Sequence, residues 1–174
     1  MMRWLAIVLF AFLLLAFESP LLHQVRAGAY APDLGLIVVL YVAFAASYET
    51  GLVVSLAIGL FKDGFSMTAP VGLHMEIFAL TFITARRLSR RIDLQGPVSI
   101  VALTAVACIA TSLAELGLCL IFDQTFNASA RTSEVLLSAM LPQALLTAPF
   151  GPVVFWALGH IDQLTTRKGE SIYP

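Results

Sequence analysis

The chain is a succession of apolar runs, and its charged side chains stand almost entirely in the joints between them. Hydrophobic residues make up 59% of the sequence and charged residues 12%, with a mean hydropathy of +0.90. An ordinary soluble domain is about 45–50% apolar and about 25% charged. A soluble protein of 174 residues has too little interior to bury this much apolar surface. The sequence therefore predicts an all-α integral membrane protein, because helices satisfy their own backbone hydrogen bonds inside lipid.

Six membrane-spanning helices are predicted, and together they form a single polytopic domain over residues 1–174. The apolar runs that define them cover residues 4–22, 34–48, 51–61, 71–85, 98–122 and 135–158. Several runs are shorter than the ~20 residues of a perpendicular span. An alternative therefore merges residues 34–61 into one tilted helix around Glu49. That merger would carry the arginine-rich segment 86–91 to the outer side, against the positive-inside preference.

The basic residues set the predicted orientation, with the N and C termini both cytoplasmic. Seven of the ten lysines and arginines then lie on the inner side: Arg3, Arg86, Arg87, Arg90, Arg91, Arg167 and Lys168. The outer side receives Arg26, Lys62 and Arg131. The cluster at 86–91 is interpreted as a cytoplasmic basic anchor that touches anionic headgroups. Docking of an acidic cytoplasmic protein on this cluster is the alternative.

The first apolar run allows a second interpretation. Arg3, the apolar residues 4–17, the break at 19–20 and the small residues 27–29 resemble a cleavable signal peptide. Cleavage would leave the orientation of the later spans unchanged.

Small residues at regular spacing mark the third run as a packing surface. Gly51, Ser55 and Gly59 recur every four residues, a spacing that lets two helix backbones approach closely. Asp63 follows at the end of the run, beside Gly64. We expect Asp63 to anchor the connection to the next helix rather than to act as a catalyst.

The connection after Asp63 leads through Pro70 and Gly72 to His74. No second histidine or cysteine stands at ligand spacing from His74. His74 is therefore interpreted as a hydrogen-bonded packing residue rather than as a metal ligand.

Glu115 is the carboxylate that lies deepest within an apolar run. Its helical face also carries small polar side chains, at Thr104, Cys108, Thr111, Ser112 and Cys119. This face should turn toward the bundle or a partner rather than toward lipid. Two interpretations stay open: an ion, proton or ligand site, or an interhelical hydrogen-bond seam with a protonated or paired Glu115.

The last run is expected to be bent or broken, because it contains Pro142, Pro149, Gly151 and Pro152. Broken helices also build transporter sites, so this feature alone does not select a function.

Signatures of catalysis are missing from the sequence. It contains no Gly-x-Ser-x-Gly frame, no Cys/His metal set and no phosphate-binding glycine loop. We therefore expect no enzymatic activity, no cofactor and no metal. The formal net charge of −1 argues against nucleic acid as a partner.

Two stretches of the chain resemble the family of the rod shape-determining membrane protein MreD. The first is Pro32-Asp33-Leu34, which opens the run that continues to Leu40-Tyr41. The second is residues 59–66, with the sequence GLFKDGFS, followed by PVGLH at 70–74. Length, six-helix layout and the basic stretch after the fourth span are similar as well. The residues that match the family pattern in the second stretch are Gly59, Asp63, Gly64, Pro70 and Gly72.

The resemblance implies a noncatalytic scaffold of the bacterial cell-elongation (rod) complex, located in the inner membrane. It implies an MreC-like bitopic membrane protein as partner and, through it, an MreB-like actin and a peptidoglycan synthase complex. Lys62 departs from the family pattern, because an apolar residue is common before the aspartate.

The alternative function is the six-helix substrate-binding subunit of an energy-coupling vitamin importer. Such a subunit needs an alanine pattern for docking its coupling partner. Ala6, Ala11 and Ala16 recur every five residues, which does not keep them on one helical face. This spacing disfavours the importer.

Overall fold

The computed structural model describes residues 2–25, 32–65, 72–91, 96–126 and 130–167. These residues form helices and no strand, in agreement with the predicted all-α class. The helices are α1 (Met2–Val25), α2 (Leu34–Ala45), α3 (Tyr48–Phe65), α4 (Leu73–Leu88), α5 (Pro97–Phe126), α6 (Ala130–Thr147) and α7 (Phe150–Arg167).

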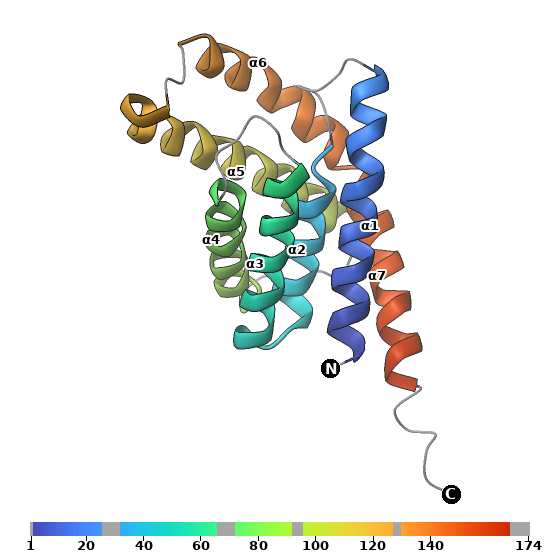
Figure 1. Cartoon of the computed structure of the whole chain (residues 1–174). Coiled ribbons are helices and arrows are strands. Elements are labelled where there is room, and N and C mark those ends of the chain that lie inside the picture. Colours follow the sequence, from blue (N-terminus) through green and yellow to red (C-terminus); the bar gives the residue numbers. More distant parts are fainter. Residues whose placement is uncertain (1, 26–31, 66–71, 92–95, 127–129, 168–174) are drawn as a thin grey trace, which may run out of the picture.

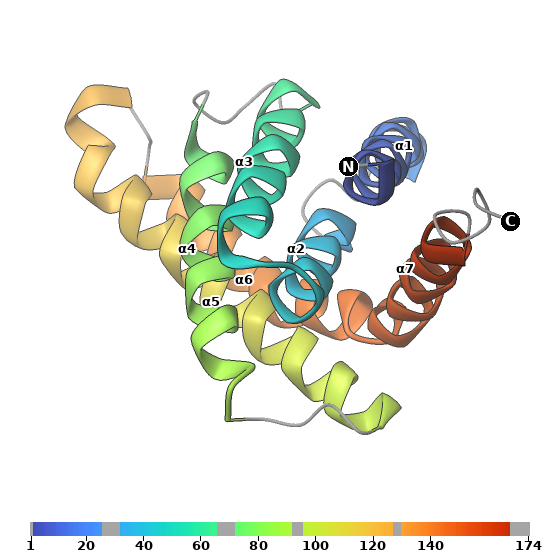
Figure 2. The ribbon, with the colours of Figure 1, turned by 90° about the horizontal axis from the view of Figure 1, so that it is seen from below.

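Helix α2 lies at the centre of the molecule. It contacts α1, α3, α4, α5 and α7, and its buried residues run almost without interruption from Gly35 to Ala43. The sequence of α2 is apolar all round, as expected for a helix enclosed on every side. Helices α1, α3, α4 and α7 run alongside it, whereas α5 and α6 slant outward from this group (Figures 1 and 2).

Several helices begin or end at one end of the bundle, which we call the lower end from its place in Figure 1. The start of α1, the junction of α2 with α3, the end of α4 and the end of α7 all lie there. An ion pair between Arg3 and Asp162 joins α1 to α7 at this end. The Tyr41 hydroxyl of α2 lies 3.5 Å from an Asp162 carboxylate oxygen and adds a third helix to the joint.

The prediction that residues 34–61 are not one helix is confirmed. Helix α2 ends at Ala45, Ala46 adopts an extended backbone, and α3 begins at Tyr48. The predicted runs 4–22, 71–85 and 98–122 each lie largely within one helix, and the run 51–61 lies wholly inside α3.

The predicted run 135–158 is not one helix but parts of two. Helices α6 and α7 meet at a bend of 43° around Ala148 and Pro149. Proline has no backbone N–H, so Pro149 cannot continue the hydrogen-bond ladder. Pro142 lies inside α6 without ending it.

One helical segment of the described residues, Pro97–Leu118 in α5, is long and apolar enough to cross a membrane by itself. The bent pair Met140–Thr147 and Phe150–Thr165 passes the same test when taken together. Arg3–Phe17 and Leu34–Ala45 are apolar but shorter.

Candidate functional site

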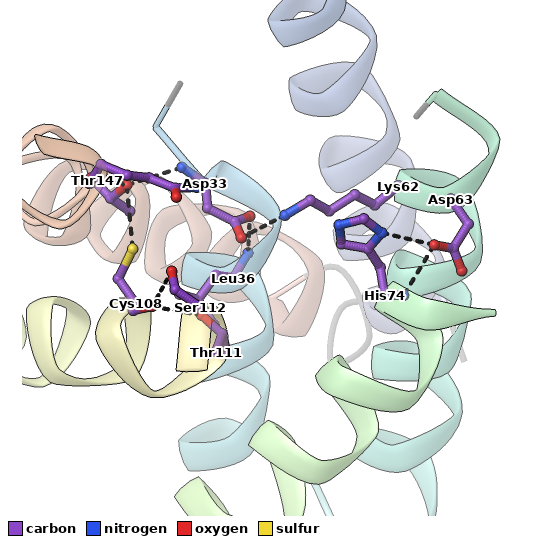
Figure 3. A network of polar contacts seen from close by, with 10 residues as sticks. Asp33, Leu36, Lys62, Asp63, His74, Cys108, Thr111, Ser112 and Thr147 are labelled. Carbon is purple, nitrogen blue, oxygen red and sulfur yellow. Dashed lines mark hydrogen bonds and ion pairs between the residues drawn. The ribbon is translucent and has the colours of Figure 1, made fainter. Parts of the chain in front are cut away.

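Four of the buried polar side chains of the described residues lie at the ends of helices: Asp33, Asp63, His74 and Thr147 (Figure 3). Two groups stand out, and each is built around one aspartate. The α4 cap consists of Asp63 with the first turn of α4. The α2 cap consists of Asp33 with Lys62 and Thr147.

The α4 cap joins the end of α3 to the start of α4. One carboxylate oxygen of Asp63 accepts hydrogen bonds from the backbone N–H of Gly72 at 2.8 Å and of Met75 at 3.3 Å. The other accepts from the backbone N–H of His74 at 3.0 Å and lies 2.8 Å from His74 Nδ1. The first N–H groups of a helix have no partner within it, so a carboxylate here satisfies them and complements the helix dipole. The prediction that Asp63 anchors this connection is confirmed.

Gly72 and His74 fit this arrangement for separate reasons. Gly72 has φ of 106°, a conformation that residues with a Cβ rarely adopt. His74 is 8% exposed and packs edge-on against Phe78, with ring centroids 6.5 Å apart. The prediction of a hydrogen-bonded packing histidine is therefore confirmed. Pro70 lies in 66–71, outside the described residues, and Gly64 is exposed with open space beside it.

The small residues of α3 are occupied within the chain itself. A Cβ added to Gly59 would lie 2.5 Å from Met75 Cα and 2.9 Å from the His74 carbonyl oxygen. A Cβ added to Gly51 would enter the ring of Phe82. The predicted close approach of two helices is confirmed, and the second helix is α4. The face that carries Gly51 and Gly59 is therefore not open to another protein.

Ser55, between these two glycines, is fully buried. Its hydroxyl has no hydrogen-bond partner among the described residues. Its small size fits the tight contact, but its polar group contributes no bond there.

The α2 cap joins three helices through one aspartate. Asp33 Oδ1 accepts from the Leu36 backbone N–H at 3.0 Å, the usual N-cap bond. Its Oδ2 lies 2.5 Å from Lys62 Nζ at the end of α3. Its own backbone N–H donates to the Thr147 hydroxyl of α6 at 3.0 Å. Lys62 Nζ also lies 5.1 Å from the ring centroid of Phe78, within cation–π distance.

Sequence reasoning missed the α2 cap. An aspartate directly before an apolar run is a helix N-cap signal, and Asp33 carries it. Lys62 was counted among the outer basic residues and noted as a departure from the family pattern, but it was not paired with Asp33. Thr147 lies 114 residues from Asp33, and nothing in the local sequence pairs them.

The inner half of the α5 polar face points into the bundle, as predicted. Thr104, Cys108, Thr111 and Ser112 are all buried. The hydroxyls of Thr111 and Ser112 both donate to the Cys108 carbonyl, at 2.9 and 3.0 Å. Cys108 Sγ lies 3.9 Å from the Thr147 hydroxyl, which links this face to the α2 cap.

Glu115 lies farther along the same helix and differs from these residues. It is half-buried and forms no hydrogen bond or ion pair with any described residue. The Cys119 side chain lies outside the described part of the chain. The described side chains thus supply no convergent polar groups for a ligand at Glu115.

The basic cluster at 86–91 divides into two parts. Arg86 is half-buried, and its Nη1 donates to the Ala43 carbonyl oxygen in the last turn of α2 at 3.0 Å. A cation at a helix C-terminus satisfies a carbonyl without an intrahelical partner. Arg87, Arg90 and Arg91 are exposed.

The polar groups of the α4 cap and the α2 cap bind the ends of neighbouring helices to one another. The contact between Asp63 and His74 has the partners that orient a histidine base in hydrolases. Here both side chains are buried, and the carboxylate is committed to backbone N–H groups. Within the described ranges, no three His, Cys, Asp or Glu side chains are grouped closely enough to hold a metal ion.

Comparison with protein-family models, with curated proteins and with solved structures found no match. No relative therefore contributes a function to this chain.

Proposed function

We propose that this chain is a noncatalytic, MreD-like scaffold of the bacterial cell-elongation complex, located in the inner membrane. One observation carries the proposal: several of the residues that bear the resemblance hold the end of α3 against the start of α4. Asp63, Gly72 and His74 form the α4 cap, and Gly59 sets the contact of α3 with α4. A motif used to build rigid helix joints suits a scaffold better than an enzyme.

The outer surface supports a location inside lipid. Large apolar side chains are exposed on every helix except the central α2; examples are Leu5 at 70%, Val98 at 78%, Leu145 at 74% and Trp156 at 73%. Soluble monomers rarely expose contiguous apolar surface on this scale. If α6 and α7 count as one bent span, the seven helices make six crossings with both termini on one side.

The positions of the basic residues support a cytoplasmic lower end. Arg3 and Arg86 both bind partners there, and the end of α7 lies beside the start of α1 (Figure 1). The arginine-rich segment then stays on the inner side, as the positive-inside rule favours.

An MreC-like bitopic protein is the proposed partner, and α5 is its proposed contact. The α3 face with Gly51 and Gly59 is covered by α4, and α2 is enclosed. Helix α5 instead presents Glu115, which no described residue binds, whereas the exposed Leu113, two residues away, points about 200° around the helix from it. A polar group in lipid favours association with a helix that can hydrogen-bond to it.

Depletion of the protein in its rod-shaped host, followed by microscopy, tests the proposed function. We expect rods to become spheres, and persistent rods would contradict the scaffold. Copurification with the MreC-like protein should fall with Glu115→Ala and persist with Leu113→Ala. Tight binding of a vitamin by the purified protein would instead favour the importer subunit.

A further inference from the structure

The lower end of α4 carries a basic patch, defined here as Arg87, Arg90 and Arg91. All three side chains are exposed, and none forms an ion pair or a hydrogen bond with a described residue. The turn that presents Arg90 and Arg91 is ordered by backbone bonds, from Ser89 N–H to Ala85 O at 2.8 Å and from Arg91 N–H to Leu88 O at 2.9 Å. The three arginines are therefore carried on a hydrogen-bonded stretch of backbone.

The patch continues the outward face of α4. Leu80, Thr84 and Arg87 are separated by four and three residues, so they share one face of the helix, and all three are exposed. Leu80 is 57% exposed. If this face meets acyl chains at Leu80, Arg87 lies about 10 Å farther along the helix, at 1.5 Å per residue. Because the headgroup layer is about 5–8 Å deep on each side of the apolar core, Arg87 is then expected at the level of the headgroups.

Aromatic residues mark the same level. Tyr48, at the start of α3, is 52% exposed, and its ring centroid lies 6.1 Å from that of Phe82 on α4. Phe82 lies one helical turn before Arg86. Tyrosine is enriched where a membrane protein passes from the apolar region to the headgroups. Exposed tyrosine beside exposed arginines points to the headgroup layer.

Arg86, next to the basic patch, has a structural role within the protein. Its guanidinium is turned inward to the Ala43 carbonyl. The neighbouring Arg87 has the same charge and no such contact. Two neighbouring arginines can therefore be compared directly. Arg86 binds the end of α2, whereas Arg87 is exposed and contacts no described polar group.

We propose that the basic patch binds the phosphate groups of anionic phospholipids in the cytoplasmic leaflet. Guanidinium groups bind phosphate oxygens through paired, charge-assisted hydrogen bonds. Lipid is the occupant because Arg87 lies on the side of the helix that faces outward, continuous with Leu80. This binding site adds to the proposed scaffold and depends on its membrane orientation, but not on its partner.

The test is lipid binding by the purified full-length chain in detergent. Phosphatidylglycerol and phosphatidylcholine are offered in equal amounts, and bound lipids are counted by native mass spectrometry. We expect preference for phosphatidylglycerol, and a fall of about fivefold in that preference with Arg87→Gln, since each basic residue near an anionic surface contributes about 1 kcal/mol. High salt should reduce the preference.

Arg86→Gln is the matched control, because it removes the same charge one residue away. It should lower thermal stability and keep the lipid preference. Replacement of all three patch arginines by glutamine should abolish the preference, whereas replacement by lysine should retain it. Equal binding of the two lipids by the wild type, or equal losses from Arg86→Gln and Arg87→Gln, would overturn the proposal. An acidic protein captured through the patch while lipid preference is absent would also overturn it.

The experiments can contradict the lipid-binding proposal and the scaffold proposal independently of each other. Preference for phosphatidylglycerol together with persistent rods on depletion would leave the lipid site standing and remove the scaffold. Spherical cells on depletion together with indifferent lipid binding would do the reverse.

Discussion

Two helical hairpins of similarly apolar sequence differ in how closely they pack. One is formed by α3 and α4, and the other by α5 and α6. In the first, the backbone at Gly59 meets the backbone of α4, and Asp63 closes the turn end. In the hairpin of α5 and α6, both helices slant away from the bundle (Figure 2). Only 22% of the residues in the most apolar part of Pro97–Leu118 are buried. Similar hydrophobicity therefore does not enclose the two hairpins to the same extent, although α5 and α6 do contact each other.

Side-chain size and hydrogen bonding explain the difference. In lipid, acyl chains solvate an apolar helix as well as another helix does, so association depends on close packing and polar contacts. Helix α3 has both, in its glycines and in Asp63. Among the described side chains of α5, the polar contacts lie on its inner half, where Thr111 and Ser112 bond to their own helix and Cys108 Sγ lies 3.9 Å from the Thr147 hydroxyl. Its contact with α7 depends on Gly151, where an added Cβ would lie 2.7 Å from the Thr104 hydroxyl.

The largest effect is expected from Lys62→Met, which removes the cation from the compact hairpin and leaves the Asp33 carboxylate buried. Breaking a buried ion pair in this way typically costs about 3–5 kcal/mol, and the lower part of this range applies here because the lysine side chain is 19% exposed. The free energy of unfolding in detergent is the measurement. Adding Asp33→Asn to Lys62→Met should restore much of the loss, since asparagine still caps a helix. A double variant as unstable as the sum of the single variants would show that the pair is not coupled.

Gly59→Leu should have the next largest effect, because the leucine would have to displace the backbone of α4. Overpacking costs about 1–3 kcal/mol, and the upper part of this range applies where backbone atoms are the obstacle. Gly64→Leu is the control on the same helix, since Gly64 has open space around it. Thermal unfolding in detergent should separate the two variants. Equal stability would mean that α3 and α4 are not in close contact.

The smallest effect is expected on the outward face of α5. Val106 is 65% exposed, so Val106→Ala should change the free energy of unfolding by less than about 0.5 kcal/mol. Val54→Ala is the matched substitution on α3, where the side chain is 4% exposed. There the cavity left behind should cost about 1 kcal/mol. Loss of stability at Val106 comparable to that at Val54 would contradict the described difference between the hairpins.

Features that depend on neighbouring residues could be predicted from the sequence. The spacing of Gly51, Ser55 and Gly59 predicted a close helix contact. The position of Asp63 at the end of the same run predicted that it anchors the connection to the next helix. The prolines of the last run predicted a bend, but not where it falls. Pro142 stays within α6, whereas α6 ends before Pro149, and a turn bond from the Gly151 N–H to the Ala148 carbonyl oxygen leads into α7.

Features that depend on distant residues could not be predicted. Asp33 meets Thr147 only because α6 ends beside the start of α2. The pairing of Arg3 with Asp162 likewise requires that α1 and α7 lie side by side. The partner of the small residues on α3 was also open, because spacing shows that a helix packs there but not which helix.

The enclosed position of α2 has a consequence for how the chain is assembled. A helix of twelve residues is about 18 Å long, whereas the apolar layer of a bilayer is about 30 Å thick. In the proposed membrane setting α2 cannot cross unaided, and Asp33 needs its lysine from the helix that is synthesised next. If the proposed membrane location holds, insertion of α2 is coupled to that of α3, and we expect the pair to enter the lipid as one unit.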